Sequence, residues 1–106
     1  MLTILTSLVL AAPVHAAPPP LWVGDTRQQV DAMLPLAQQA APGPRLVLLA
    51  RRLLGRPYAA FSLDAEPRER LRLDLTRFDC ALLVEQLLAL VQSRSADGFA
   101  QQVQRL

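Results

Sequence analysis

The spacing of apolar residues along this chain indicates four helical segments and one short strand. The first helix follows Asp25 or Thr26, either of which can cap its N-terminus, and it runs to Ala37. Pro35 lacks the backbone N–H that a helix interior uses, so this helix is expected to bend there or to end early. Trp22, just before the helix, is expected to be an early anchor of the core.

A second helix is predicted after a break at residues 42–44, which read Pro-Gly-Pro. From Arg45 onward the apolar positions recur at helical spacing, with Arg51 and Arg52 on the other side. Gly55 is placed to stop this helix, because glycine readily adopts the left-handed conformation that ends helices. The segment is therefore expected to be an amphipathic helix.

The next recognisable pattern is a short alternation at residues 71–75. Leucines there alternate with Arg72 and Asp74, the period-two pattern of a half-buried strand. A segment this short is equally consistent with a loop. The composition of residues 56–70 is irregular, so no regular element is predicted before it.

The most apolar helix is predicted to begin at Cys80 and to run to Val91. Thr76 and Asp79 have the spacing of a capping box, and Cys80 lies in the first turn whichever of them is the cap. One face is expected to carry Cys80, Leu83, Val84, Leu87, Leu88 and Val91. Because most other positions are apolar too, this helix is expected to be buried on most sides. A polar, turn-like stretch then leads to a fourth helix from Phe99.

Residues 1–16 have the features of a secretory signal peptide. Most of this stretch is apolar, and Val14 and Ala16 supply the small residues that signal peptidase requires before its cleavage site. An N-terminal core helix is the alternative, but the prolines at 18–20 oppose it. The apolar run is also shorter than the roughly twenty residues that cross a bilayer. The protein is therefore expected to be exported to the periplasm or the extracellular space, without stable membrane insertion after cleavage.

Composition limits the possible partners and cofactors. The chain has 11 basic and 9 acidic residues, a net charge of +2, and only Arg51 and Arg52 cluster, so no nucleic-acid partner is expected. No CxxC, HExxH or glycine-rich phosphate loop is present, so neither a metal nor another cofactor is predicted. The single cysteine, Cys80, excludes an internal disulfide. Its free thiol is either reactive or a small buried hydrophobic group.

The predicted place of Cys80 at a helix start is suited to nucleophilic chemistry. Unpaired N–H groups in a first helical turn favour the thiolate, and they can also hydrogen-bond an oxyanion. Arg77 favours the same negative charge whereas Asp79 opposes it, so the sequence leaves this balance open.

Several short motifs follow one another in the second half of the chain. They are Gly55-Arg56-Pro57-Tyr58, Glu69-Arg70-Leu71, Phe78-Asp79-Cys80, Val84-Glu85 and Leu88-Ala89-Leu90. Together they resemble the N-terminal part of the bacterial N-acetylmuramoyl-L-alanine amidase-like family, which belongs with the NlpC-type papain-like cell-wall peptidases. The resemblance runs from about Leu46 to Leu106. It implies an α+β papain-like fold in the parent family, of which this chain covers mainly the helical N-terminal half and so is mostly α.

The resemblance also implies roles for individual residues. Cys80 would be the nucleophile, Tyr58 would lie near the active site and contact substrate, and Thr76 and Asp79 would support the helix start. The substrate would be peptidoglycan or a cell-wall peptide. Taken without the resemblance, a tyrosine that follows a proline packs on the core with its hydroxyl in water.

The chain departs from the family pattern in two ways. Ala81 and Leu82 stand where the family usually has small hydroxyl residues. The only histidine is His15, inside the expected leader, although a thiolate that attacks an amide needs a histidine to protonate the leaving amine. The chain is therefore expected to stop before the histidine region and to be inactive alone. The sheet that covers the cysteine helix in the parent fold would largely be missing too, which leaves an apolar face uncovered.

These patterns divide the chain into a leader at 1–16, an extension with one helix at 17–44 and the start of an amidase-like domain at 45–106. One hypothesis is a truncated, exported cysteine amidase or peptidase, whose parent activity hydrolyses an amide bond of peptidoglycan through a thioester. The alternatives are a non-catalytic remnant and a small exported helical binding protein.

Overall fold

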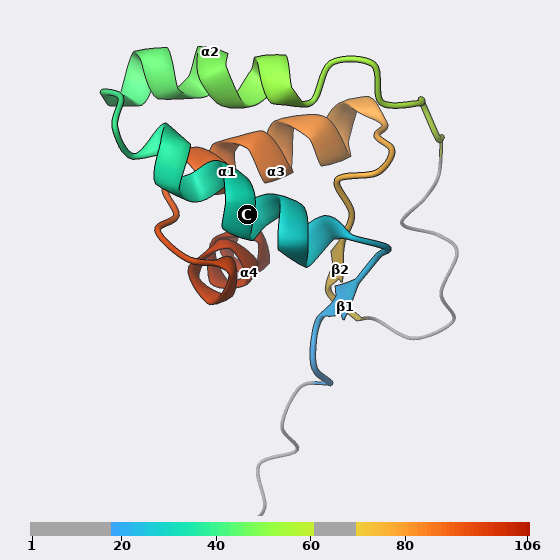
Figure 1. Ribbon diagram of the computed structural model, residues 1–106. Coiled ribbons are helices and arrows are strands. Elements are labelled where there is room, and N and C mark those ends of the chain that lie inside the picture. The colour runs from blue at the N-terminus through green and yellow to red at the C-terminus, as the bar shows by residue number, and fades with distance from the viewer. Residues whose placement is uncertain (1–17, 61–69) are drawn as a thin grey trace, which may run out of the picture.

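The computed structural model describes residues 18–60 and 70–106, in which four helices enclose one apolar core (Figure 1). The elements are β1 (Leu21–Trp22), α1 (Thr26–Ala37), α2 (Pro42–Arg52), β2 (Arg72–Leu73), α3 (Cys80–Val91) and α4 (Ala96–Arg105). Helices α1 and α3 each pack against the other three helices, and the contacts of α3 with α2 and α4 are the most extensive. The described part is mostly helical, as the sequence predicts. The leader expected at residues 1–16 lies outside the described residues.

Helix α1 continues through its internal proline. It begins at Thr26, whose side chain is fully buried and donates a hydrogen bond to the carbonyl of Val23 at 2.6 Å. Pro35 is exposed and does not end the helix early, since regular structure extends to Ala37. The core face of α1 carries Val30, Met33, Leu34 and Ala37.

Helix α2 begins three residues before the predicted start. Pro42, Gly43 and Pro44 form its first turn instead of a break. Proline is tolerated in the first turn because the backbone N–H groups there make no hydrogen bonds within the helix. The fixed φ of proline also suits a helix. Leu49 and Leu53 face the core, and Gly55 follows with a φ of 84°, the left-handed conformation expected at this helix end.

The two strands form a short parallel sheet that the sequence only half predicted. Leu21 pairs with Arg72, and Trp22 pairs with Leu73. The second strand was predicted as strand or loop, whereas β1 was not predicted because two residues are too few to show a period. Trp22 is half-buried and its ring lies 6.1 Å from that of Phe99, so it does pack on the core.

The buried face of α3 is narrower than the sequence predicts. The fully enclosed positions are Leu82, Gln86, Ala89 and Leu90. Cys80 is exposed, and so are Val84 and Leu88, at 55% and 42% of their surface. The prediction that this helix is buried on most sides was wrong. Nearly every position of the helix is apolar, so apolar spacing could not show which face is buried.

Two further contacts hold the helix ends. The Arg45 guanidinium donates to the carbonyls of Ala37, Ala40 and Val91, each at 3.0 Å, and so joins the C-terminal ends of α1 and α3. Helix α4 begins at Ala96, three residues before the predicted start at Phe99. Its N-cap is Ser95, whose hydroxyl accepts a hydrogen bond from the Gly98 amide at 3.0 Å.

Candidate functional site

Two segments that lie about twenty residues apart in sequence meet directly before α3. The amide of Ala59 donates to the carbonyl of Phe78 at 2.9 Å, and the amide of Phe78 donates to the carbonyl of Pro57 at 3.0 Å. Tyr58 and Phe78 thus form a parallel bridge. Because this bridge ends two residues before Cys80, it brings Tyr58 and Cys80 to the same part of the molecule.

Cys80 is the first residue of α3 and carries an exposed free thiol. This exposure excludes the alternative that Cys80 is a small buried hydrophobic group. Asp79 is the N-cap, and its carboxylate accepts a hydrogen bond from the amide of Leu82 at 2.8 Å. The amides of Cys80 and Ala81 donate to no backbone or side-chain acceptor among residues 18–60 and 70–106. Two N–H groups therefore remain beside the sulfur for an oxyanion.

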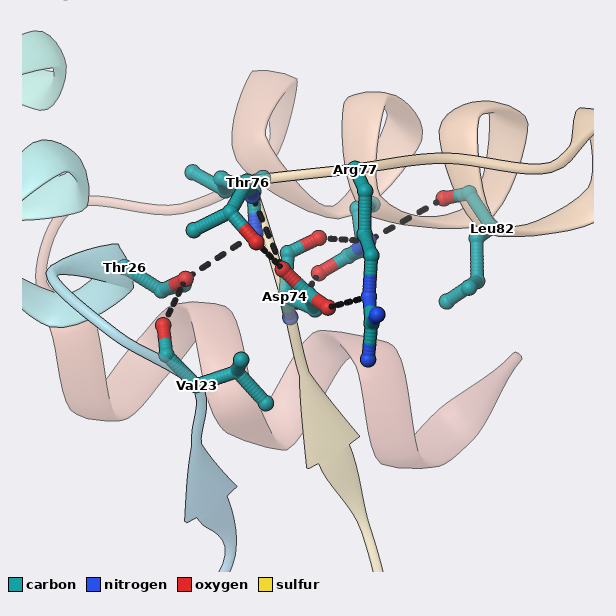
Figure 2. Close-up of polar contacts among 8 residues, drawn as sticks. Val23, Thr26, Asp74, Thr76, Arg77 and Leu82 are labelled. Carbon is teal, nitrogen blue, oxygen red and sulfur yellow. Dashed lines mark hydrogen bonds and ion pairs between the residues drawn. The ribbon is translucent and has the colours of Figure 1, made fainter. Parts of the chain in front are cut away.

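The predicted capping box does not form. Thr76 does not cap α3; its amide and hydroxyl donate to the Asp74 carboxylate at 2.8 and 2.5 Å. Figure 2 shows this carboxylate between Thr76 and Arg77, whose Nε lies 3.3 Å from it. Asp74 is fully buried, so its charge requires these partners. Because the Thr76 side chain is bonded to Asp74, it does not cap α3, and Asp79 is the N-cap.

Gln86 fixes the segment before Cys80 to the middle of α3. Its side-chain oxygen accepts from the amide of Asp74 at 2.8 Å, and its NH₂ group donates to the carbonyl of Asp74 at 2.7 Å. The Leu75 amide donates to the Thr26 hydroxyl at 3.0 Å, which attaches the same segment to α1 (Figure 2). Sequence reasoning missed Gln86, and it named Thr26 only as a possible helix cap. One available signal was a glutamine inside a mostly apolar helix, since a buried amide needs a hydrogen-bonding partner.

A groove of about 400 Å³ opens beside Cys80, where the end of α2 lies next to the start of α3 (Figure 1). Its walls are mostly apolar, with Arg56 and Tyr58 among the few polar groups. The apolar lining comes from Ala50, Leu53, Leu54, Phe78, Leu83 and Leu87. Tyr58 is 71% exposed, so its ring is not packed on the core. Cys80 and Tyr58 therefore line one groove, and Asp79 lines it with them.

Within residues 18–60 and 70–106, no three side chains of the metal-binding types Asp, Glu, His or Cys gather in one place. None of the helices in these two ranges has the length and apolarity needed to cross a bilayer.

Comparison with known families places the second half of the chain in one family. The model of the N-acetylmuramoyl-L-alanine amidase-like family matches residues 48–106. The chain belongs to this family. The amidase-like match includes every residue that lines the groove, whereas α1 and the first part of α2 precede it. No curated protein and no solved structure matches the chain.

Proposed function

We propose that Cys80 is the nucleophile of an exported cysteine amidase or peptidase that hydrolyses an amide bond of peptidoglycan. The observation that carries this proposal is an exposed thiol at a helix N-terminus, next to a groove, in a chain of the amidase-like family. The two amides at this helix start have no acceptor among residues 18–60 and 70–106. A thiol in such a position is accessible to substrate.

The reaction would proceed through a thioester. The Cys80 thiolate attacks the amide carbon, a carbon–sulfur bond forms, and the carbonyl oxygen becomes an oxyanion that the amides of Cys80 and Ala81 can hydrogen-bond. The carbon–nitrogen bond then breaks, and the amine leaves with a proton. Water attacks the thioester, which releases a carboxylic acid and regenerates the thiol.

Two steps of this reaction require a group that moves protons. The thiol must lose one and the leaving amine must gain one, and a histidine does both in cysteine hydrolases of this type. His15 is the only histidine among the 106 residues, and it lies in the expected leader. The proposed reaction therefore requires a histidine from outside these 106 residues. The 106-residue chain alone is then expected to be inactive.

Other residues of the groove would hold the substrate. Tyr58 is exposed on the wall beside Cys80 and can pack its ring against a bound peptide while its hydroxyl donates or accepts a hydrogen bond. Asp79 would act by capping α3 rather than by proton transfer, because its carboxylate already accepts the Leu82 amide. Residues 1–16 would act as an export leader and bring the enzyme to its substrate.

The test begins with the genomic locus. Sequencing past codon 106 in all three frames and expressing the longest continuous product gives the protein to assay on purified peptidoglycan. We expect a histidine-bearing region, release of muropeptide fragments by the longer protein, and complete loss of release in Cys80→Ala. The matched control is Ser93→Ala, which replaces a buried hydroxyl far from the groove. A confirmed stop at this point would refute the proposal and favour a non-catalytic binding protein. Cleavage that survives Cys80→Ala would refute the role of Cys80 as the nucleophile.

A further inference from the structure

The groove beside Cys80 carries a positive charge that the proposed reaction does not use. Most of its lining is apolar, and apart from Cys80 its ionisable side chains in the described part are Arg56, Tyr58 and Asp79. The Asp79 carboxylate accepts a hydrogen bond from the Leu82 amide at 2.8 Å, so it is engaged in capping α3. The Arg56 guanidinium is therefore the formal charge that these lining residues leave available to a ligand.

Arg56 is held in place by neutral groups. Its Nη2 donates to the side-chain oxygen of Gln29 at 2.9 Å, and the NH₂ group of Gln29 donates to the Asp25 carboxylate at 2.6 Å. A neutral acceptor restrains the guanidinium without cancelling its charge. No carboxylate within residues 18–60 and 70–106 forms an ion pair with Arg56. A guanidinium has five N–H donors, so donors remain for a ligand carboxylate, which arginine binds in a bidentate fork.

The two charges of the groove lie on different segments. Arg56 belongs to the segment that follows α2, whereas Asp79 directly precedes α3. The negative charge of Asp79 is partly offset by the positive N-terminal end of the α3 dipole. An anionic ligand is therefore attracted to the Arg56 wall of the groove, and its uncharged part can reach the exposed thiol of Cys80. The mostly apolar walls strengthen this attraction, because they limit the water that would screen it.

We propose that Arg56 makes the groove selective for amides that carry a carboxylate group. The guanidinium would bind the carboxylate while the amide carbon lies at the Cys80 sulfur, and a neutral amide of the same shape would bind less well. That such a ligand is a substrate rests on the proposed function. The preference for a negative charge rests on the groove alone.

The test uses the thiol of Cys80 as its own probe. Cys80 is the only cysteine of the chain, so alkylation of the 106-residue protein reports on this groove alone. Iodoacetylglycine and iodoacetylglycinamide have nearly the same size and the same reactive carbon, but only the first carries a carboxylate. Mass spectrometry at low ionic strength gives both second-order rate constants. Their ratio measures the preference for the anion, because a change in thiol ionisation would alter both rates by the same factor.

We expect Arg56→Gln to lower the ratio of the anionic to the neutral rate roughly three- to fivefold, the effect of one exposed charge pair. Arg56→Lys keeps the charge and should retain most of the preference. The matched control is Arg52→Gln, because Arg52 is exposed nearby on α2 but does not line the groove, and its ratio should equal that of the wild type. Added salt, at about 0.5 M, should bring the wild-type ratio close to that of Arg56→Gln.

Two results would overturn the proposal. They are an unchanged ratio in Arg56→Gln and an equal fall in Arg52→Gln, which would mean that net charge and not the groove sets the preference. The readout requires neither a histidine nor peptidoglycan, so it separates the two proposals. A ratio that falls only in Arg56→Gln, without peptidoglycan cleavage by the longer protein, would refute the proposed function alone. Cleavage that depends on Cys80, with an unchanged ratio in Arg56→Gln, would refute the role of Arg56 alone.

Discussion

At the scale of single residues, Asp79 sets where α3 begins and therefore where the thiol lies. Its carboxylate accepts the Leu82 amide, one of the N–H groups that a helix start leaves unpaired. Asparagine caps helices about as well as aspartate, whereas alanine does not. We expect Asp79→Ala to lower the free energy of unfolding by about 1 kcal/mol and Asp79→Asn to leave it nearly unchanged. Urea unfolding followed by circular dichroism measures both. Equal losses in the two variants would mean that the charge, not the cap, stabilises the site.

Gln86 is a second residue whose effect should be large. It pairs with both the amide and the carbonyl of Asp74 in a fully buried position. Leucine has a similar size but would leave both backbone groups without a partner, so we expect Gln86→Leu to cost roughly 2–5 kcal/mol. Gln28→Leu, at an exposed position of α1, should change stability by less than about 0.5 kcal/mol. The same urea titration compares the two, and a Gln86→Leu protein of wild-type stability would exclude this anchoring role.

At the scale of elements, Arg45 holds two helix ends with one side chain. Its guanidinium donates to carbonyls at the C-terminal ends of α1 and α3, where a positive charge also interacts favourably with the helix dipoles. We expect Arg45→Met to cost about 2–4 kcal/mol, and Arg45→Lys to lie between Met and wild type because lysine keeps the charge but not the fork of donors.

The control for this prediction is Arg52→Met. Arg52 belongs to the same helix, but its side chain is exposed and makes no hydrogen bond or ion pair to any residue in the described part of the chain. Thermal unfolding should show little change for Arg52→Met and a clear drop in Tm for Arg45→Met. A similar drop in both would show that the loss of charge on α2, and not the bridge, determines the result.

The sequence predicts where the helices lie along the chain, but it does not predict how they pack. Apolar spacing located all four, and proline and serine at their starts account for the early beginnings of α2 and α4. It could not orient α3, because an almost uniformly apolar helix has no preferred face until the Gln86–Asp74 contact selects one. That contact joins residues twelve apart and follows no period.

The candidate site, too, could be predicted only in part from the sequence. The family resemblance singled out Cys80 and Tyr58, and the structure shows them on one groove. The two backbone hydrogen bonds that join their segments depend on tertiary pairing, so no local pattern could indicate them. The capping box failed for a related reason: Asp74, buried by its neighbours, competes for the Thr76 side chain.

At the scale of the whole molecule, the described part leaves apolar side chains of α3 in water. Val84 and Leu88 are one helical turn apart, and they are 55% and 42% exposed beside the groove residue Leu83. An uncovered face of this kind is expected to associate with apolar surfaces, including those of other copies. We therefore expect the 106-residue protein to show concentration-dependent self-association in size-exclusion chromatography with light scattering.

The double variant Val84→Gln/Leu88→Gln removes this face while it spares the core, because both side chains already lie outside it. We expect the variant to remain monomeric at concentrations where the wild type associates, with its free energy of unfolding lowered by no more than about 1 kcal/mol. Leu36→Gln, an equally apolar and 41% exposed position on α1, is the control and should associate like the wild type. If Leu36→Gln also abolished association, self-association would reflect overall surface hydrophobicity; if neither variant changed it, another surface would be responsible. If only the α3 variant lost association, the exposed face of α3 would be the surface through which the copies associate.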